Sequence, residues 1–144
     1  MNLIPESTKL FLEESQIASI CFVDKENNPY CVNCFYAFDA ENGILALKST
    51  VGTNHHTMIA TEKKVAGTIL PNEVNPLKIK GLQFQGEIVS QGLITDFKCS
   101  AAYYKKYPFA LAMPGYIWAI SLDKMKLTDN TLVFGKKEKW ERRF

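Results

Sequence analysis

Apolar and polar residues alternate along much of this chain, and the alternation predicts a protein built mainly of β-strands. The clearest case is residues 78–90, in which Leu82, Phe84 and Ile88 fall on one side and Gln83 and Gln85 on the other. Other stretches rich in β-branched and aromatic residues predict strands at residues 17–23, 30–38, 43–48, 64–70 and 117–127, with a last short one at 131–134.

Short polar turns join the first three predicted strands. Residues 24–29 (DKENNP) and residues 39–43 are turn-forming sequences, so these strands are expected to form an antiparallel meander. Within residues 117–127 the apolar positions change parity at Asp123 and Lys124, which indicates a β-bulge there. Gly81 and Gly86 suit bends or bulges in a curved sheet.

Helical periodicity is confined to three short segments, residues 5–14, 53–61 and 95–107. In the first, Leu10 and Phe11 are expected to face inward. The third ends before Pro108 and places Phe97, Ala101 and Tyr104 on one face. The apolar loop at residues 109–115 is expected to pack against another surface.

These elements amount to a mainly β (α+β) chain with six or seven strands and about three short helices. So many strands in 144 residues are expected to close into a small barrel, because closure removes exposed sheet edges. A barrel of that size fills with its own side chains. A ligand is therefore expected outside it, at a rim or between subunits. The length fits one domain spanning residues 1–144.

Composition and charge narrow the class of protein. Hydrophobic residues make up 47% and charged residues 22%, and the net charge of +2 is too small to favour a nucleic-acid partner. The aromatic and basic run at residues 103–107 falls on a predicted helix, where tyrosines pack and lysines face water. No apolar run approaches the roughly 20 residues that span a bilayer. The N-terminal residues do not form a signal peptide, so no membrane partner and a cytoplasmic location are expected.

The cysteine spacing first suggests a redox or metal pair and then argues against it. Cys31 and Cys34 form a C-x-x-C pattern, but on a strand they point to opposite faces with Cα atoms about 10 Å apart. That separation is too large for a disulfide. No second cysteine pair follows, and the adjacent His55 and His56 diverge on a helix, so no metal site is expected.

The most distinctive chemical signal lies in residues 43–59, GILALKSTVGTNHHTMI. An apolar strand runs into a loop of small hydroxyl residues, and the loop opens a helix whose first N–H groups are unpaired. With the donors of Ser49, Thr53 and Asn54, this arrangement predicts a cradle for a phosphate or another anion. The alternative is that Thr53 or Asn54 only caps the helix. The basic tail at residues 135–144 is likewise either a solvated terminus or an arm that reaches an anionic ligand.

The order of the elements, with the stretches NCFYAFDAENG, VAGTI, IKGLQFQGEI and LTDNTLVFGKKEKW, resembles the flavin mononucleotide (FMN)-binding split-barrel superfamily related to pyridoxamine 5′-phosphate oxidase. The resemblance covers nearly the whole chain and is strongest to the YhbP-like bacterial proteins. It implies a six- to seven-stranded antiparallel split β-barrel. It also implies a homodimer with FMN at the subunit interface.

The resemblance further implies which residues contact FMN. The second strand would run along the isoalloxazine ring with Cys31, Val32, Asn33 and Cys34. Lys48 would approach the flavin, and the phosphate would be held by Ser49, Thr53, Asn54 and His55. Gln83 and Gln85 would come from the fifth strand, in the same or the partner subunit. The site would be closed near the tail by Lys136, Lys137 and Trp140.

A flavin would supply the reactive centre itself, which agrees with the lack of a recognisable catalytic set in the sequence. The resemblance therefore implies an FMN-dependent oxidoreductase acting on an unidentified small molecule, with catalytic residues unassigned. Pyridoxamine phosphate oxidation is not expected, because the oxidase's C-terminal tryptophan and arginine signature is missing. The alternative is a non-enzymatic protein that binds or senses a flavin or haem, the haem ligand being His55, His56 or Cys99.

Overall fold

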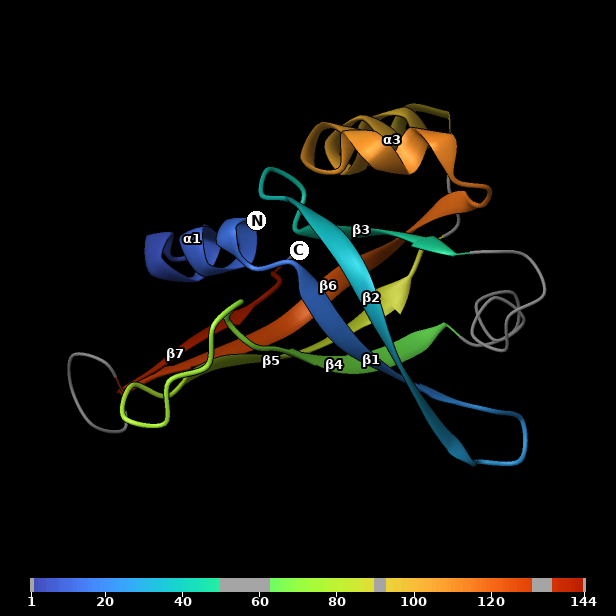
Figure 1. Cartoon of the computed structure of the whole chain (residues 1–144). Helices are drawn as coiled ribbons and strands as arrows, with labels where there is room; N and C mark the ends of the chain where they lie inside the picture. Colours follow the sequence, from blue (N-terminus) through green and yellow to red (C-terminus); the bar gives the residue numbers. More distant parts are fainter. Residues whose placement is uncertain (1, 50–62, 90–92, 131–135, 144) are drawn as a thin grey trace.

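The structure is a computed structural model that describes residues 2–49, 63–89, 93–130 and 136–143 (Figure 1). The described elements, in chain order, are α1 (Glu6–Glu14), β1 (Ile17–Val23), β2 (Pro29–Asp39), β3 (Ile44–Ser49), β4 (Lys64–Ile69), β5 (Lys80–Ile88), α3 (Leu93–Lys106), the 3-10 helix η1 (Pro108–Ala112), β6 (Tyr116–Asp129) and β7 (Lys136–Glu141). The predicted helix at residues 53–61 and strand at residues 131–134 lie outside the described residues.

The described strands form one antiparallel sheet in the order β3-β2-β1-β4-β5-β6-β7. A further pairing of β3 with β6, from Ile44 opposite Ser121 to Ser49 opposite Tyr116, closes six of them into a barrel. β7 continues the sheet beyond the barrel along β6. The predicted barrel and the meander of the first three strands are confirmed.

The predicted β-bulge in β6 is also confirmed. Gln85 of β5 lies opposite Lys124, but the next residue, Gly86, lies opposite Leu122, so Asp123 is the extra residue. A side chain at Gly86 would meet the carbonyl oxygen of Ser121 at 2.4 Å, which explains the glycine opposite the bulge. The bulge changes the side-chain parity of β6. After the bulge, the side chains of Lys124 and Lys126 face outward, whereas Met125 and Leu127 are buried.

The C-terminal segment is part of the fold, which neither interpretation of the basic tail anticipated. It forms strand β7, and Trp140 is only 4% exposed. Arg142 donates from Nε to the carbonyl oxygen of Leu122 at 2.8 Å and from Nη2 to those of Asn42 and Gly43, both at 2.9 Å. The guanidinium of Arg142 thus donates hydrogen bonds to main-chain carbonyls near the bulge.

Two apolar layers form the core. The barrel interior holds the larger one, and a second lies between α3 and the outer faces of β2, β3 and β6, with the members Ala37, Ala46, Cys99, Tyr103, Tyr107, Ala110 and Ala119. Figure 1 shows α3 lying over β3 and the neighbouring strands. The sheet therefore has one covered outer region and one that no described helix covers.

One predicted inward side chain was wrong, because Leu10 is 46% exposed. Phe97, which was predicted to share a face of α3 with Ala101 and Tyr104, is 76% exposed. In α1 the buried side chains are Thr8, Phe11 and Leu12, and Leu10 lies on another side of the same turn. The loop at residues 109–115 buries Ala110 but leaves Phe109 and its apolar neighbours exposed. No helix in the described part of the chain is long and apolar enough to cross a membrane.

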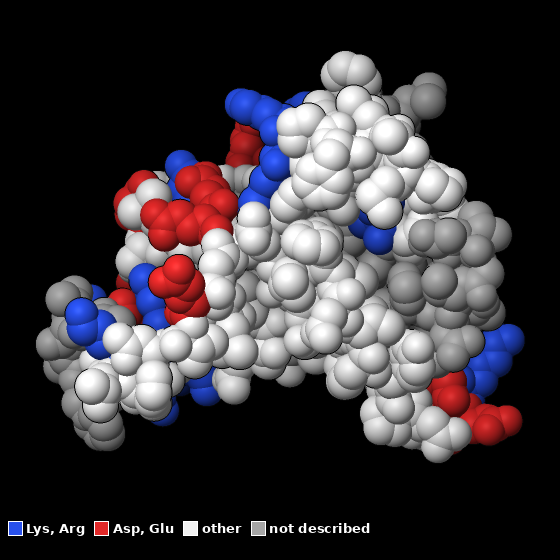
Figure 2. Space-filling view, viewed as in Figure 1, with Lys and Arg blue, Asp and Glu red and all other residues white. Residues whose placement is uncertain are grey.

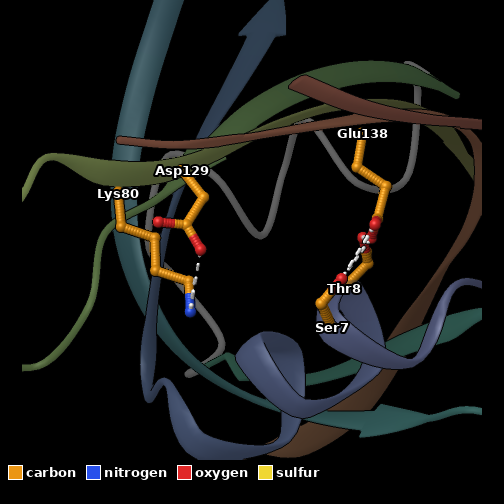
Figure 3. A network of polar contacts seen from close by, with 5 residues as sticks. All are labelled: Ser7, Thr8, Lys80, Asp129 and Glu138. Atoms are coloured by element: carbon orange, nitrogen blue, oxygen red, sulfur yellow. Dashed lines mark hydrogen bonds and ion pairs between the residues drawn. The ribbon is translucent and has the colours of Figure 1, made fainter. Parts of the chain in front are cut away.

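Helix α1 is tied to β7 through one carboxylate (Figure 3). Ser7 and Thr8 donate their hydroxyl protons to Glu138 at 2.7 and 2.5 Å. Burial alone would raise the pKa of Glu138, but these hydrogen bonds outweigh it and hold the pKa below its ordinary value. Lys80 and Asp129, 3.8 Å apart, form an ion pair near the same end of the barrel.

The depressed pKa makes the docking of α1 sensitive to acid. The carboxylate stabilises the fold above the ordinary carboxyl pKa of 4.5, and that contribution is lost as pH falls through and below this value. We expect Glu138→Gln to lower the free energy of unfolding at pH 7. The difference from wild type should shrink towards zero by about pH 3 in urea titrations.

Glu141→Gln is the matched control on the same strand, because its ion pair with Lys124 at 3.6 Å is solvent-exposed. It should change the free energy of unfolding little at either pH. A Glu138→Gln effect of equal size at pH 7 and pH 3 would contradict the role of the charge.

Candidate functional site

Two parallel rows of outward-facing residues cross six strands on the part of the sheet that α3 leaves uncovered. The strand register gives the first row as Cys31, Cys21, Ala66, Gln85, Lys124 and Glu141. The second row lies two residues away from the first on each strand and consists of Asn33, Ser19, Thr68, Gln83, Lys126 and Lys139. We call these two rows the open face.

A groove of about 840 Å³ lies along the open face. Its lining contains every residue of the two rows except Asn33, together with Asn2, Gly67, Phe84, Met125, Trp140 and Arg143. The volume falls within the range of roughly 300–1,000 Å³ typical of small-molecule sites. The groove is thus large enough for an organic ligand of cofactor size.

The groove carries positive charge at the β6 and β7 end. Lys124, Lys126, Lys139 and Arg143 line it, against the single carboxylate of Glu141. Glu141 pairs with Lys124 at 3.6 Å, so it offsets only part of that charge. A net positive, concave surface attracts anionic ligands, phosphate esters among them.

The floor between the two ends of the groove carries uncharged side chains. Ser19, Ala66 and Thr68 are small, and Gly67 lets the ring of Phe84 lie close beneath the strand, since a Cβ atom there would be 2.3 Å from that ring. Ser19 donates its hydroxyl proton to Oδ1 of Asn33 at 2.6 Å. That bond turns the Nδ2 protons of Asn33 into the donors available to a ligand.

The structure brings several of the sequence-predicted residues together. Cys31, Asn33, Gln83 and Gln85 lie on the open face of one chain, so a partner subunit is not required to combine them. Trp140 borders the groove, with its indole N–H donating to the carbonyl oxygen of Asn2 at 3.2 Å.

Two predicted residues on β2 point the other way. Cys34 is 8% exposed within the barrel core, and Val32 packs against that core. Their contribution to a ligand on the outer side is therefore limited to main-chain groups. Burial raises the pKa of the Cys34 thiol to about 11, so it stays protonated at neutral pH.

The remaining predicted residues lie away from this groove or outside the described residues. Lys48 donates from Nζ to the carbonyl oxygens of Ala110 and Met113, both at 2.7 Å, and lies 4.9 Å from the centre of the Tyr104 ring. Three further predicted residues do not line the groove. Ser49 is buried, and Lys136 and Lys137 are exposed at the start of β7. The predicted residues outside the described part of the chain are Thr53, Asn54 and His55.

Sequence reasoning missed most of the residues that line the groove, although signals for some of them were present. The parity change at Asp123 implies that Lys124 and Lys126 face the same side as Gln83 and Gln85. The turn between β1 and β2 likewise fixes Cys21 opposite Cys31, whose Sγ atoms are 2.7 Å apart. The predicted divergence of Cys31 and Cys34 is confirmed, but Cys31 has a different cysteine beside it.

Solved structures share this architecture. A haem-binding protein from Mycobacterium smegmatis superposes on 97% of the chain with a TM-score of 0.75 at 13% identity, and the chain spans 60% of that protein's length. An FAD-binding protein from Mesorhizobium loti matches 85% of the chain and 92% of its own length, with a TM-score of 0.63 at 14% identity.

A Clostridium acetobutylicum protein of the pyridoxinephosphate oxidase family matches 94% of the chain and 92% of its own length, with a TM-score of 0.63 at 13% identity. This chain therefore shares the fold of proteins described as haem-binding, FAD-binding and belonging to the pyridoxinephosphate oxidase family. The superfamily resemblance seen in the sequence is confirmed.

Sequence relatives narrow the class to one family. The protein YhbP of Salmonella paratyphi A is 38% identical over 133 residues, which are 92% of this chain and 89% of the relative. A protein of Serratia proteamaculans is 33% identical over 144 residues, 99% of each chain. Both carry the family name UPF0306, and this chain belongs to the UPF0306 family. No protein-family model matches the chain.

The contacts of Lys48 assign it a structural task that can be measured. We expect Lys48→Met to free η1, because two charge-assisted hydrogen bonds to its carbonyls are lost. Amide hydrogen exchange at Ala110 and Met113 should become faster by about tenfold or more. The exposed Lys64 on β4 offers the matched control, Lys64→Met. Unchanged exchange in Lys48→Met, with weaker flavin binding, would instead support the ligand contact implied by the resemblance.

Proposed function

We propose that this protein binds FMN in the groove of the open face and acts as an FMN-dependent oxidoreductase on a small molecule. The observation that carries the proposal is the groove itself, which combines an uncharged floor, the carboxamide side chains of Gln83 and Gln85, and a basic end. Structural neighbours described as an FAD-binding protein and an F420 reductase support a flavin over other phosphorylated ligands.

The residues of the open face match the parts of FMN. Gln83, Gln85 and Asn33 offer both donors and acceptors, which suit the polar edge of an isoalloxazine ring. The small side chains of Ser19, Ala66 and Thr68 let a planar ring lie close to the sheet. Lys126 and Lys139 offer charge for the phosphate at the other end. The sequence indicates a second, alternative contact for the same phosphate at Ser49, Thr53, Asn54 and His55, because Ser49 lies opposite Tyr116, far from Lys126 along β6.

When bound, the flavin supplies hydride and electron transfer, and the protein supplies position and electrostatics. Gln83 and Gln85 orient the polar edge of the ring by hydrogen bonds. Asn33, fixed by the hydroxyl of Ser19, donates to a ring acceptor and stabilises negative charge that develops there. The sheet shields one side of the ring from water, which leaves the other side for the substrate.

The proposed form of the protein is a homodimer. Large apolar side chains are exposed in the single chain on and beside η1, namely Phe35, Phe109, Leu111, Met113 and Tyr116, with Phe35 and Phe109 both in contact with Tyr107. Figure 2 shows that charged side chains are sparse over this side of the molecule, between α3 and β2. Exposed apolar surface of this kind commonly marks a protein interface.

A non-enzymatic haem protein is the second candidate, favoured by the haem-binding neighbour. Among the candidate ligands, Cys99 is 1% exposed on the side of α3 that packs against the sheet, so it is not accessible to a haem iron. His55 and His56 lie outside the described residues. No group of three or more His, Cys, Asp or Glu side chains within the described ranges is placed to hold a metal ion. The described residues therefore favour a flavin.

Flavin titration with charge-reversal variants tests the placement of the phosphate. We expect wild type to bind FMN at micromolar concentration, and Lys126→Glu to weaken binding on the order of tenfold, which is about 1.4 kcal/mol. Thr53→Glu tests the second contact, since a carboxylate beside a phosphate costs on the order of several kcal/mol. Lys98→Glu, on the exposed side of α3, is the matched control with the same charge change.

Sedimentation followed at the flavin absorbance reports the size of the species that carries the cofactor. Flavin moving with a two-chain species is the expected result. Colourless protein that takes up no FMN, or equal binding by wild type and both site variants, would contradict the proposed site. A Soret band in the purified protein would favour the haem alternative.

Enzymatic activity is tested separately from binding. We expect anaerobic addition of a reduced nicotinamide to bleach the bound flavin within seconds, followed by recovery of colour when air is admitted. Free FMN at the same concentration is the control for uncatalysed reduction. Flavin that stays oxidised with both NADH and NADPH, and with a panel of small reductants, would indicate a binding or sensing protein.

A further inference from the structure

One pair of side chains on the open face has chemistry that flavin binding does not use. Cys21 of β1 and Cys31 of β2 are register partners, and their Sγ atoms lie 2.7 Å apart as free thiols. Both line the groove. Cys31 is exposed and Cys21 is partly exposed, so a reagent in the groove reaches this pair from solvent.

The other two cysteines are closed to such a reagent. Cys34 is 8% exposed inside the barrel, and Cys99 is 1% exposed on the side of α3 that packs against the sheet. Cys34 also points to the opposite face of β2 from Cys31. The reactive thiols of the folded chain are therefore the two on the open face.

The backbone geometry allows Cys21 and Cys31 to bond. Directly opposed residues on antiparallel strands have Cα atoms about 4.5 or 5.5 Å apart, depending on the pair type. A disulfide spans Cα separations of about 4.4–6.8 Å. The bond thus needs no displacement of either strand.

We propose that Cys21 and Cys31 are a redox-active dithiol that closes to an intramolecular disulfide by exchange with a small-molecule disulfide. In the first step the thiolate of Cys31 attacks one sulfur of the small disulfide, and the other sulfur leaves as a thiolate that takes up the proton from Cys31. In the second, Cys21 loses its proton and attacks Sγ of Cys31, releasing the second small thiol. Two protein thiols are oxidised and one small disulfide is reduced to two thiols.

The surroundings of the pair set the order of attack. The hydrogen bond with Cys31 is the main cause that raises the pKa of the Cys21 thiol, which disfavours the Cys21 thiolate. Cys31 is the more exposed of the two and is therefore the first nucleophile. Once the mixed disulfide forms on Cys31, Cys21 is already beside the sulfur that it must attack. The net positive groove favours the approach of an anionic disulfide.

Oxidised glutathione is the probe that tests this proposal on the full chain. After incubation with it, the protein is quenched in acid, alkylated under denaturing conditions, and analysed by intact mass and peptide mapping. The expected product has lost two hydrogen atoms, carries no glutathione, and yields one cross-linked peptide pair joining Cys21 to Cys31. Cys34 and Cys99 remain open to alkylation.

Cys21→Ser separates the two steps, because it removes the resolving thiol. We expect this variant to accumulate a stable glutathione adduct on Cys31, whereas Cys99→Ala, the matched control with a buried cysteine removed, should behave as wild type. A stable adduct on wild type, a disulfide between chains, or no modification of wild type would each overturn the proposal. The wild-type map alone decides the matter if a variant fails to fold.

The dithiol reaction and the flavin proposal stand independently, since the exchange needs no bound cofactor. Running the same incubation with and without saturating FMN connects them. A protein that forms the disulfide but binds no flavin retains the dithiol and loses only the proposed function. Slower exchange with FMN present is the result expected if both ligands occupy the same groove.

Discussion

Pairing of β3 with β6 is the constraint on which the rest of the structure depends. It joins the two ends of a six-strand sheet and leaves β6 with three neighbours, since its first half pairs with β3, its second half with β7, and most of its length with β5. The bulge at Asp123 lies where β6 changes from one partner to the other. Arg142, directly after β7, donates a hydrogen bond to the carbonyl oxygen of Leu122 beside that bulge. This contact stabilises the position at which β6 exchanges β3 for β7 as its neighbour.

Closure divides the outer surface into two regions with different tasks. Helix α3 buries its aromatic side against β2, β3 and the first half of β6, which forms the second apolar layer. The remaining strands keep their outward side chains in water, and these side chains are small, amide-bearing or basic. The groove of the open face therefore arises from the position of one helix and the side-chain parity of one bulged strand.

The barrel could be predicted because strand alternation and polar turns are local signals, and the bulge because the change of parity at Asp123 is also local. The groove could be predicted only in part. Gln83 and Gln85 were recognisable as polar positions on an alternating strand, whereas Lys139 required a strand that the tail sequence did not reveal. The contact of Cys21 with Cys31 depends on the register across the turn between β1 and β2, which composition and the C-x-x-C spacing do not express.

The central claim is that the open face, rather than the face under α3, receives the ligand. Backbone amide shifts of the isotope-labelled protein, recorded by NMR during addition of FMN, test it most directly. The account predicts the largest changes along the two rows, at Ser19, Gln83 and Lys126. Changes confined to α3 and η1, or an unchanged spectrum at saturating FMN, would contradict it.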